Sequence, residues 1–334
     1  VSKWTCQVDA AASLNGGVKA LIEQLFETLQ RDYGAELVRT ALAILTFSVK
    51  GVSDVEMEDL LSLHDGVLDK VFQYATPNVR RLPTHVWLRL KAAMDGLIVE
   101  GEHGCFQWYH RQLKETAETW FASEKLVAHG MMARYLGNLV DERTRTQRQI
   151  AQQPWTLRGD AFDAASVVNV RRCCEATYHM LQSGLWGLAS KEICNFAGIC
   201  SQMRAGEGFT LVRDLFQLHQ QGNLHWATYE NAVESRLLVY HYFRWLRQEI
   251  SALNNQCLTN FTFSASAQPR TSLVREHMQQ FLDVRRRVSL RFQFNRGRVL
   301  NAKTDFDALL AKLEGHSGCV YSVCFSPDGK TLAS

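Results

Sequence analysis

The chain has 334 residues, of which 46% are hydrophobic, so it carries enough apolar material for roughly two or three compact domains. The chain has no apolar run of about 18 residues, and its first residues lack the core of a signal peptide, so nothing in the sequence points to a membrane. Its nine cysteines include no Cys-x-x-Cys pair and fit a reducing compartment, cytoplasmic or nuclear, better than a disulfide framework. The net charge of +3 is too small to indicate nucleic-acid binding by itself.

Residues 35–125 are predicted to form a winged helix-turn-helix domain. Apolar residues from Leu37 to Leu45 have helical spacing, and Ser53 or Asp54 is suited to cap a second helix that runs to Leu63. A third helix is expected over residues 82–94, after an insertion that two prolines bound. Two short strands, 97–100 and 106–108, then flank a glycine turn and predict a hairpin. The alternative is a helical bundle with a β-excursion.

Residues 126–260 are predicted to form an all-α domain, because long segments between Pro154 and Pro269 show apolar steps of three and four. We expect its clearest apolar stripe to pack against other helices rather than to bind a cofactor. The stripe consists of Tyr229, Val233, Leu237, Tyr240, Phe243, Leu246 and Ile250.

A basic connector is predicted over residues 261–312. No acidic residue falls between Val284 and Leu300, and residues 289–294 alternate like a strand with one solvated face. We interpret this segment as an interdomain β-strand with surface arginines; the alternative is an RNA- or DNA-binding strip. Its arginines are Arg285, Arg286, Arg287, Arg291, Arg296 and Arg298.

Residues 313–334 have the order of features that opens a WD repeat, and this part is expected to be an incomplete β-propeller blade. Gly315-His316 precedes alternating apolar residues, and Pro327-Asp328-Gly329 then supplies a turn. Because one half-blade cannot close a propeller, we expect further blades in a longer parent protein. Gly329-Lys330-Thr331 also matches the end of a phosphate-binding loop, but Cys324 stands where that motif needs glycine, so a hairpin turn is the better interpretation.

The order of these segments resembles NACHT and WD repeat proteins, which are STAND ATPases of the nephrocystin-3-like and telomerase- and vault-associated-protein-like kind. The resemblance covers most of the chain. It rests on Arg31 to Arg39 (RDYGAELVR), Gly51-Val52-Ser53, Glu58 to Leu61 (EDLL), Trp108 to Leu113 (WYHRQL), Gln153-Pro154-Trp155, Ala176 to Leu181 (ATYHML), Gly184-Leu185-Trp186, Asn195-Phe196 and Leu211 to Leu215 (LVRDL).

The resemblance implies a parent that binds ATP or ADP and couples nucleotide exchange to self-association. The chain contains no Walker loop, so the NACHT core of such a parent would lie upstream, and residues 1–34 would be a lead-in helix from it. No cofactor is therefore expected in this chain. The resemblance also implies a nucleotide sensor, since His110 has the place of a histidine that reaches the β-phosphate of ADP in related STAND proteins. Tyr109 and Arg111 depart from the usual Met-His-Asp form, and the alternative is a packing or helix-start histidine.

Other ligand-capable clusters give weaker signals. His103, Cys105 and His110 fall short of a four-ligand zinc site, so no metal is predicted. Cys173, Cys174 and His179 lack an identifiable orienting acid, and buried structural cysteines are the preferred interpretation. No common catalytic signature is present, so the chain is not predicted to be an enzyme.

The sequence therefore predicts a regulatory and scaffold portion that relays nucleotide state between an upstream ATPase core and a downstream propeller, which binds protein partners. Self-association is an additional expectation. The rival function is nucleic-acid binding, in which the third helix of the winged domain would enter a groove beside the arginine-rich segment. That helix or its flank carries Arg80, Arg81, His85, Arg89 and Lys91.

Overall fold

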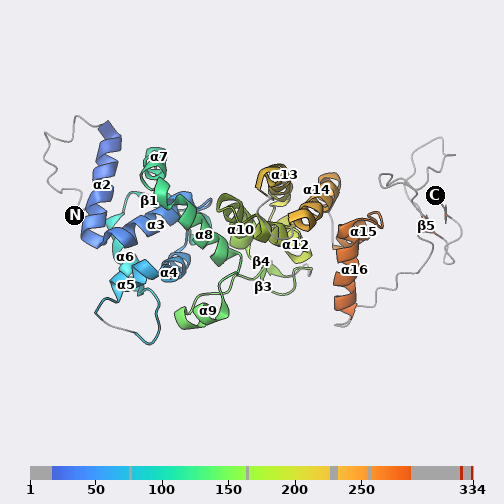
Figure 1. Cartoon of the computed structure of the whole chain (residues 1–334), viewed down its shortest axis with the longest axis horizontal. Helices are drawn as coiled ribbons and strands as arrows, with labels where there is room; N and C mark the ends of the chain where they lie inside the picture. Colours follow the sequence, from blue (N-terminus) through green and yellow to red (C-terminus); the bar gives the residue numbers. More distant parts are fainter. Residues whose placement is uncertain are drawn as a thin grey trace. The chain divides into compact units, whose positions relative to one another are not determined.

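The computed structural model describes residues 17–74, 77–162, 165–225, 232–254, 258–286, 324–325 and 332–333. These residues are mainly helical, as the sequence predicts (Figure 1). Their strands form three antiparallel pairs. The chain separates into two compact units, Val1–Val239 and Tyr240–Ser334.

The first unit begins with helices that enclose a shared apolar core. Phe26, Val38 and Trp87 are fully buried there, and Phe26 packs against the ring of Phe121 at 5.2 Å between centroids. The helices are α2 (Gly17–Tyr33), α3 (Ala35–Phe47), α4 (Asp54–Leu63), α5 (Asp65–Val71) and α6 (Thr84–Ala93). The predicted helices of residues 35–94 are thus confirmed, while α5 is an element that the sequence pattern did not predict.

Helix α4 starts where its capping residues dictate. The Ser53 hydroxyl accepts a hydrogen bond from the Glu56 backbone N–H, and the Glu56 carboxylate accepts one from the Ser53 backbone N–H. This capping box satisfies donors that the first helical turn would otherwise leave unpaired. Of the two caps that the sequence allowed, the structure therefore selects Ser53.

The predicted hairpin is present as β1 (Ile98–Glu100) paired antiparallel with β2 (Phe106–Trp108). Val52, between α3 and α4, makes an isolated antiparallel bridge to Phe106, with N–H to oxygen distances of 3.0 and 2.9 Å in the two directions. Gly51 allows this approach, because its φ is +83° and a Cβ would lie 2.3 Å from the Phe106 carbonyl oxygen. The segment between α3 and α4 is therefore fixed to the hairpin.

The described remainder of the first unit contains helices, the first residues of α14 (Ala232–Asn254) among them, and one small strand pair, β3 (Thr156–Arg158) with β4 (Val167–Val168). Helix α8 lies along α10 (Figure 1), and the polar groups that join them are described below. The other helices are α7 (Arg111–Trp120), η3 (Ala122–Glu124), α8 (Lys125–Leu136), α9 (Glu142–Arg148), α10 (Val170–Gln182), α11 (Trp186–Ile193), α12 (Phe196–Arg204) and α13 (Gly208–His225).

The second unit contains the end of α14 (Ala232–Asn254), then α15 (Leu258–Ser266) and α16 (Leu273–Arg286). Trp245 of α14 is fully buried; its indole N–H donates to the Ser264 hydroxyl at 2.9 Å, and its ring meets Phe261 edge-on. Helices α15 and α16 occupy the first part of the segment that the sequence predicted as a basic connector.

The predicted apolar stripe of α14 is partly wrong. Leu246 and Ile250 are buried, but Leu237 is 48% exposed and Tyr240 is 39% exposed. Among the described side chains of α14, the buried apolar ones are Val239, Tyr242, Trp245, Leu246, Ile250 and Leu253. The side chains of Tyr229 and Val233, the first two members of the predicted stripe, lie outside the described part of the structure. Helical spacing finds several overlapping stripes in a helix this rich in apolar residues, and the available partners select among them.

Near the end of the chain, β5 (Cys324–Phe325) pairs antiparallel with β6 (Leu332–Ala333). This pairing agrees with the strand and the returning strand that the sequence predicts, while the predicted turn between them lies outside the described residues. The residues that define the WD pattern, Gly315, His316, Pro327, Asp328 and Gly329, lie outside the described residues, as does the predicted strand at 289–294.

Candidate functional site

One ridge of α10 carries three ionisable side chains, Arg171, Glu175 and His179, at successive i, i+4 positions. This spacing places them one above the other on the same face of the helix. Glu175 and His179 have no exposed surface. A row of charged residues usually lies in solvent, so this burial requires partners on neighbouring elements.

Glu175 obtains those partners from three places. Its carboxylate accepts the backbone N–H groups of Val49 and Lys50, each at 3.1 Å. It also forms a salt bridge with Arg171 and accepts from His179 Nε2 at 3.0 Å. Burial alone would raise the pKa of this carboxyl, but the His179 hydrogen bond and the Arg171 charge outweigh it and hold the pKa at about 2. Glu175 is therefore a buried anion at neutral pH.

Arg171 joins this anion to α4 and to the segment before it. Its Nε donates to a Glu56 carboxylate oxygen at 2.8 Å, and its Nη2 donates to the Gly51 carbonyl oxygen at 2.7 Å. Glu56 uses its other oxygen in the capping box of α4. Burial lowers the pKa of Arg171, but the negative charges of Glu175 and Glu56 raise that pKa by more than burial lowers it, so the guanidinium remains charged. We call Glu56, Arg171 and Glu175 the α10 clamp.

A second anchor lies at the start of α10. The Asn169 side chain caps the helix by accepting the Arg172 backbone N–H at 3.1 Å. The Arg172 guanidinium binds Glu192 of α11 and stacks over the Trp155 ring, 4.1 Å from its centroid. Trp155 lies so close to Gly198 of α12 that a Cβ there would be 2.5 Å from the ring. Arg172 of α10 thus contacts α11 directly through Glu192, and it contacts Trp155, which packs against α12.

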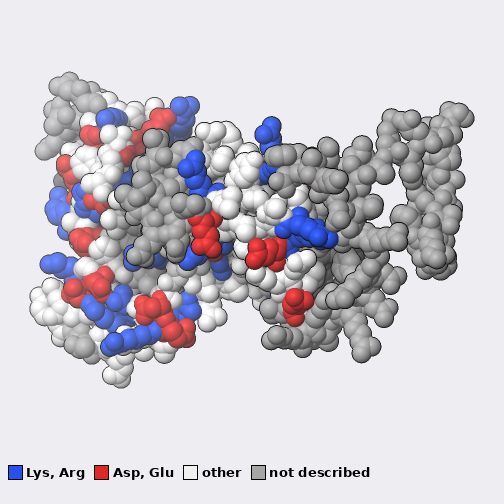
Figure 2. Space-filling model, turned by 45° about the vertical axis from the view of Figure 1, so that its right-hand side comes forward, with Lys and Arg blue, Asp and Glu red and all other residues white. Residues whose placement is uncertain are grey.

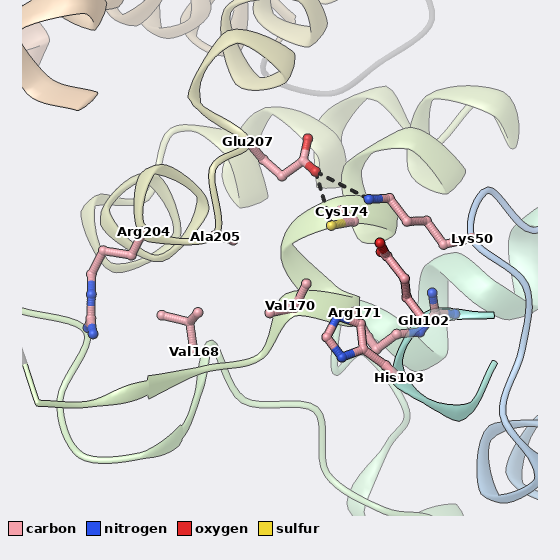
Figure 3. Close-up of a pocket in the computed structure, with 10 residues that line it drawn as sticks. All are labelled: Lys50, Glu102, His103, Val168, Val170, Arg171, Cys174, Arg204, Ala205 and Glu207. Atoms are coloured by element: carbon pink, nitrogen blue, oxygen red, sulfur yellow. Dashed lines mark hydrogen bonds and ion pairs between the residues drawn. The ribbon is translucent and has the colours of Figure 1, made fainter. Parts of the chain in front are cut away.

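A pocket of about 280 Å³ opens beside the clamp (Figure 3). Its lining contains acidic, basic and a few apolar side chains. Lys50 Nζ lies 3.9 Å from a carboxylate oxygen of Glu207, and the Glu207 carboxylate also accepts a hydrogen bond from the Cys174 thiol at 3.3 Å. The lining residues are Lys50, Glu102, His103, Val168, Val170, Arg171, Cys174, Arg204, Ala205 and Glu207.

The thiol in this pocket is not activated. Burial, together with the hydrogen bond to Glu207, raises the pKa of Cys174 to about 12, and burial raises the pKa of Cys173 to about 12 as well. A thiol that stays protonated is a poor nucleophile. Cys173 is buried, as the structural interpretation expects. His179 is directed to Glu175 instead of to either thiol, which the sequence did not predict.

His110 is the N-cap of α7 and is exposed. Its Nδ1 accepts the Gln112 backbone N–H at 3.3 Å. A neutral imidazole that accepts at Nδ1 carries its hydrogen on Nε2, so the Nε2–H can donate to an external acceptor. The structure places His110 at a helix start, and its role as a nucleotide sensor stays a prediction.

The possible zinc ligands of the hairpin region do not converge. His103 and His110 are exposed, whereas the Cys105 side chain is buried. Within the described part of the chain, no group of three or more His, Cys, Asp or Glu residues is arranged to hold a metal ion.

The basic residues proposed for groove binding are largely engaged within the protein. Arg80 forms salt bridges with Asp65 and Asp69, Arg81 with Glu58 and Asp59, and Lys91 with Asp54 at 2.7 Å. Arg89 lies over the Tyr33 ring, and His85 is exposed. Figure 2 shows Lys and Arg side chains interspersed with Asp and Glu side chains over the described part of one face. These ion pairs weigh against a phosphate-binding role for α6.

The arginine-rich strip is mostly outside the described residues. Arg285 and Arg286 fall at the end of α16, so the first part of the strip is helical. Arg287, Arg291, Arg296 and Arg298 lie outside the described residues.

The α10 clamp was not found from the sequence. Its only local signal is the spacing of Arg171, Glu175 and His179, which is that of an ordinary solvated salt-bridged face. The apolar residues Ala176 and Met180 on the same helix give no indication of which face is covered.

Comparison with known proteins finds homologues among NACHT and WD repeat proteins. The chain is 29% identical over 182 residues to mouse NACHT domain- and WD repeat-containing protein 1, covering 48% of this chain and 11% of that protein. It is 25% identical over 262 residues to mouse NACHT and WD repeat domain-containing protein 2, and 24% identical over 262 residues to the human protein of that name, covering 64% of this chain and 15% of each relative. The matched region is thus a small part of these relatives' length.

No protein-family model matches the chain, and no solved structure matches it significantly. Among the described residues, none of the helices combines the length and apolar character needed to cross a membrane.

Proposed function

We propose that this chain is a non-catalytic regulatory and scaffold portion of a NACHT and WD repeat protein. It relays nucleotide state from an ATPase core that precedes it to a WD propeller that follows it and binds protein partners. The homology to NACHT and WD repeat proteins supports this assignment. ATP or ADP would bind the upstream core of the parent protein, and the winged-helix and helical regions of this chain would change position when the nucleotide changes.

Residues 35–125 are proposed to be a winged-helix domain. The order helix, short extended segment, helices and hairpin is the order of elements in that fold. The bridge from Val52 to Phe106 supports it, because it attaches the segment between the first two helices to the hairpin as a third strand. Helix α5 would be an insertion before the third helix.

The observation that carries the relay is the α10 clamp. Glu175 binds two backbone N–H groups of the α3–α4 connection, and Arg171 binds both the Gly51 carbonyl and Glu56 at the start of α4. Breaking a matched set of buried charges leaves them without solvent, which costs several kcal/mol. A displacement of the proposed winged-helix domain would therefore move α10 and the helices packed on it.

His110 is proposed to report the nucleotide. It is exposed at the start of α7 and its Nε2–H is available to an outside acceptor. A hydrogen bond to the β-phosphate of ADP would be worth about 1–3 kcal/mol and would hold the closed state of the parent.

The test of the sensor is the rate of ADP release from the full-length parent. His110→Ala should accelerate release roughly 5- to 150-fold, the kinetic equivalent of losing that bond. His85→Ala, which removes an exposed histidine of α6, is the matched control and should leave the rate unchanged. An unchanged rate in His110→Ala would remove the nucleotide role from this chain.

The test of the relay is hydrogen exchange in the same parent when ADP is replaced by a non-hydrolysable ATP analogue. In the unmodified protein, protection should change in both α4 and α10. In Arg171→Met, protection should change in α4 but not in α10. The control Arg158→Met, at an exposed position in β3, should show the change in both helices, as the unmodified protein does. An equal response of α10 with and without the clamp would contradict the relay.

A further inference from the structure

A pair of histidines is buried between α8 and α10. His129 is 1% exposed and His179 is fully buried, and their Nδ1 atoms lie 2.8 Å apart. At this distance the two nitrogens share one hydrogen, because two bare nitrogens or two N–H groups would repel each other.

The partners of the pair decide where each hydrogen lies. Glu175 is an anion that can only accept, so His179 donates to it through Nε2–H. A neutral His179 then has a bare Nδ1, and the His129 Nδ1–H donates to it. His129 Nε2 is left as a buried acceptor, with no hydrogen-bond partner among the described residues. An unpaired acceptor is tolerated in a protein interior better than an unpaired N–H.

We propose that this histidine pair is a proton-sensitive lock on the α8–α10 interface, which mild acid opens. The proposal concerns proton binding by the folded chain and does not depend on a nucleotide or on the relay.

One added proton on His129 has a defined structural result. It occupies Nε2 and creates a buried N–H that has no acceptor among the described residues. This proton thus replaces a tolerated acceptor with an unpaired donor and adds a charge to the interior.

Among the residues that the structure describes, none of the groups around the pair offers His129 a compensating anion. From α10, Glu175 already faces both Arg171 and His179, and the Tyr178 ring meets His129 edge-on. From α8, Lys125 adds a positive charge, and from α3 the Phe47 ring packs at 5.6 Å between centroids. Burial, then the neighbouring His179 and Lys125, lower the pKa of His129 to about 3.

The direction of the pH effect follows from this difference. The unfolded chain takes up a proton on histidine near pH 6.5, while folded His129 resists it until about pH 3. The contribution of neutral His129 to the stability of the folded chain is therefore fully present above pH 6.5. It is lost as the pH falls below 6.5, and the folding equilibrium constant decreases by up to tenfold for each pH unit. Between pH 7.5 and 5.0 the Glu175 carboxyl adds little pH dependence, because it is ionised both in the folded chain, where its pKa is about 2, and in the unfolded chain, where the reference pKa is 4.5.

The experiment compares three forms of the 334-residue chain between pH 7.5 and 5.0. Amide hydrogen exchange of α8 and α10 is measured in the unmodified chain, in His129→Asn/His179→Gln, and in His85→Asn. Asn and Gln place amide N–H groups near the replaced ring nitrogens but do not titrate in this range. We expect protection in α8 and α10 to fall roughly tenfold from pH 6.0 to 5.0, after correction for intrinsic exchange, in the unmodified chain and in His85→Asn. The double variant should not show this fall.

Two results would overturn the lock. One is constant protection of α8 and α10 in the unmodified chain over this pH range. The other is an undiminished fall in the double variant. If the double variant does not fold, NMR titration of the imidazoles in the unmodified chain replaces it, and a His129 that takes up a proton near pH 6.5 without loss of α8 and α10 protection contradicts the proposal.

Discussion

Replacing Glu175 with glutamine should destabilise the first unit by about 3 kcal/mol. The carboxyl has a pKa of about 2 in the folded chain, against a reference value of 4.5. This difference corresponds to about 3 kcal/mol of stabilisation at neutral pH, since one pKa unit is about 1.4 kcal/mol. Glutamine keeps the shape of the side chain, but its amide NH₂ replaces one of the two oxygens that accept from Val49, Lys50 and His179. Arg171 would keep Glu56 as its remaining anionic partner. Removing one partner of a buried pair has a similar cost of about 3–5 kcal/mol.

The assay is urea unfolding at pH 7.5, with Glu27→Gln at an exposed position of α2 as the matched control. The control removes the same charge from solvent and should change the free energy of unfolding by less than about 0.5 kcal/mol. The loss in Glu175→Gln should shrink as the pH falls from 4.5 toward 2, because the native carboxylate contributes less as it becomes protonated. A loss at pH 7.5 no larger than that of the control would refute the assignment of Glu175 as a buried anion that holds the clamp together.

Three further predictions follow from the close contacts and the charges. Gly51→Ala should destabilise the chain by more than Gly34→Ala in chemical unfolding, because both glycines have positive φ but only at Gly51 would the Cβ meet a backbone oxygen, at 2.3 Å; equal losses would contradict the close contact with the hairpin. Gly198→Ala should cost on the order of 2 kcal/mol by displacing the Trp155 ring, and an unaltered unfolding midpoint would show that the ring yields freely. The chain should bind oligonucleotides without steep salt dependence, since Arg80 and Arg81 are paired with acids; sub-micromolar, salt-sensitive binding, measured by fluorescence anisotropy, would favour the nucleic-acid function instead.

Local chemistry determined the elements that the sequence predicted correctly. The Ser53 and Glu56 pair marks the start of α4, and the apolar spacing of residues 37–45 marks α3. The glycine turn between Glu100 and Phe106 marks the hairpin. In each case the sequence pattern and the interaction that it predicts involve residues only a few positions apart, so the element can be predicted without knowing any distant contact.

Tertiary structure alone decided which faces and charges are buried. Arg171 and Glu175 have the spacing of a solvated salt bridge, yet they meet Glu56 and the backbone of residues 49–51, more than a hundred positions away in the chain. Arg81, equally, was a possible phosphate ligand until its position beside buried Asp59 was known. Periodicity specifies the faces of a helix but not what covers them, and the burial of a charge depends on donors and acceptors that the fold brings from distant segments.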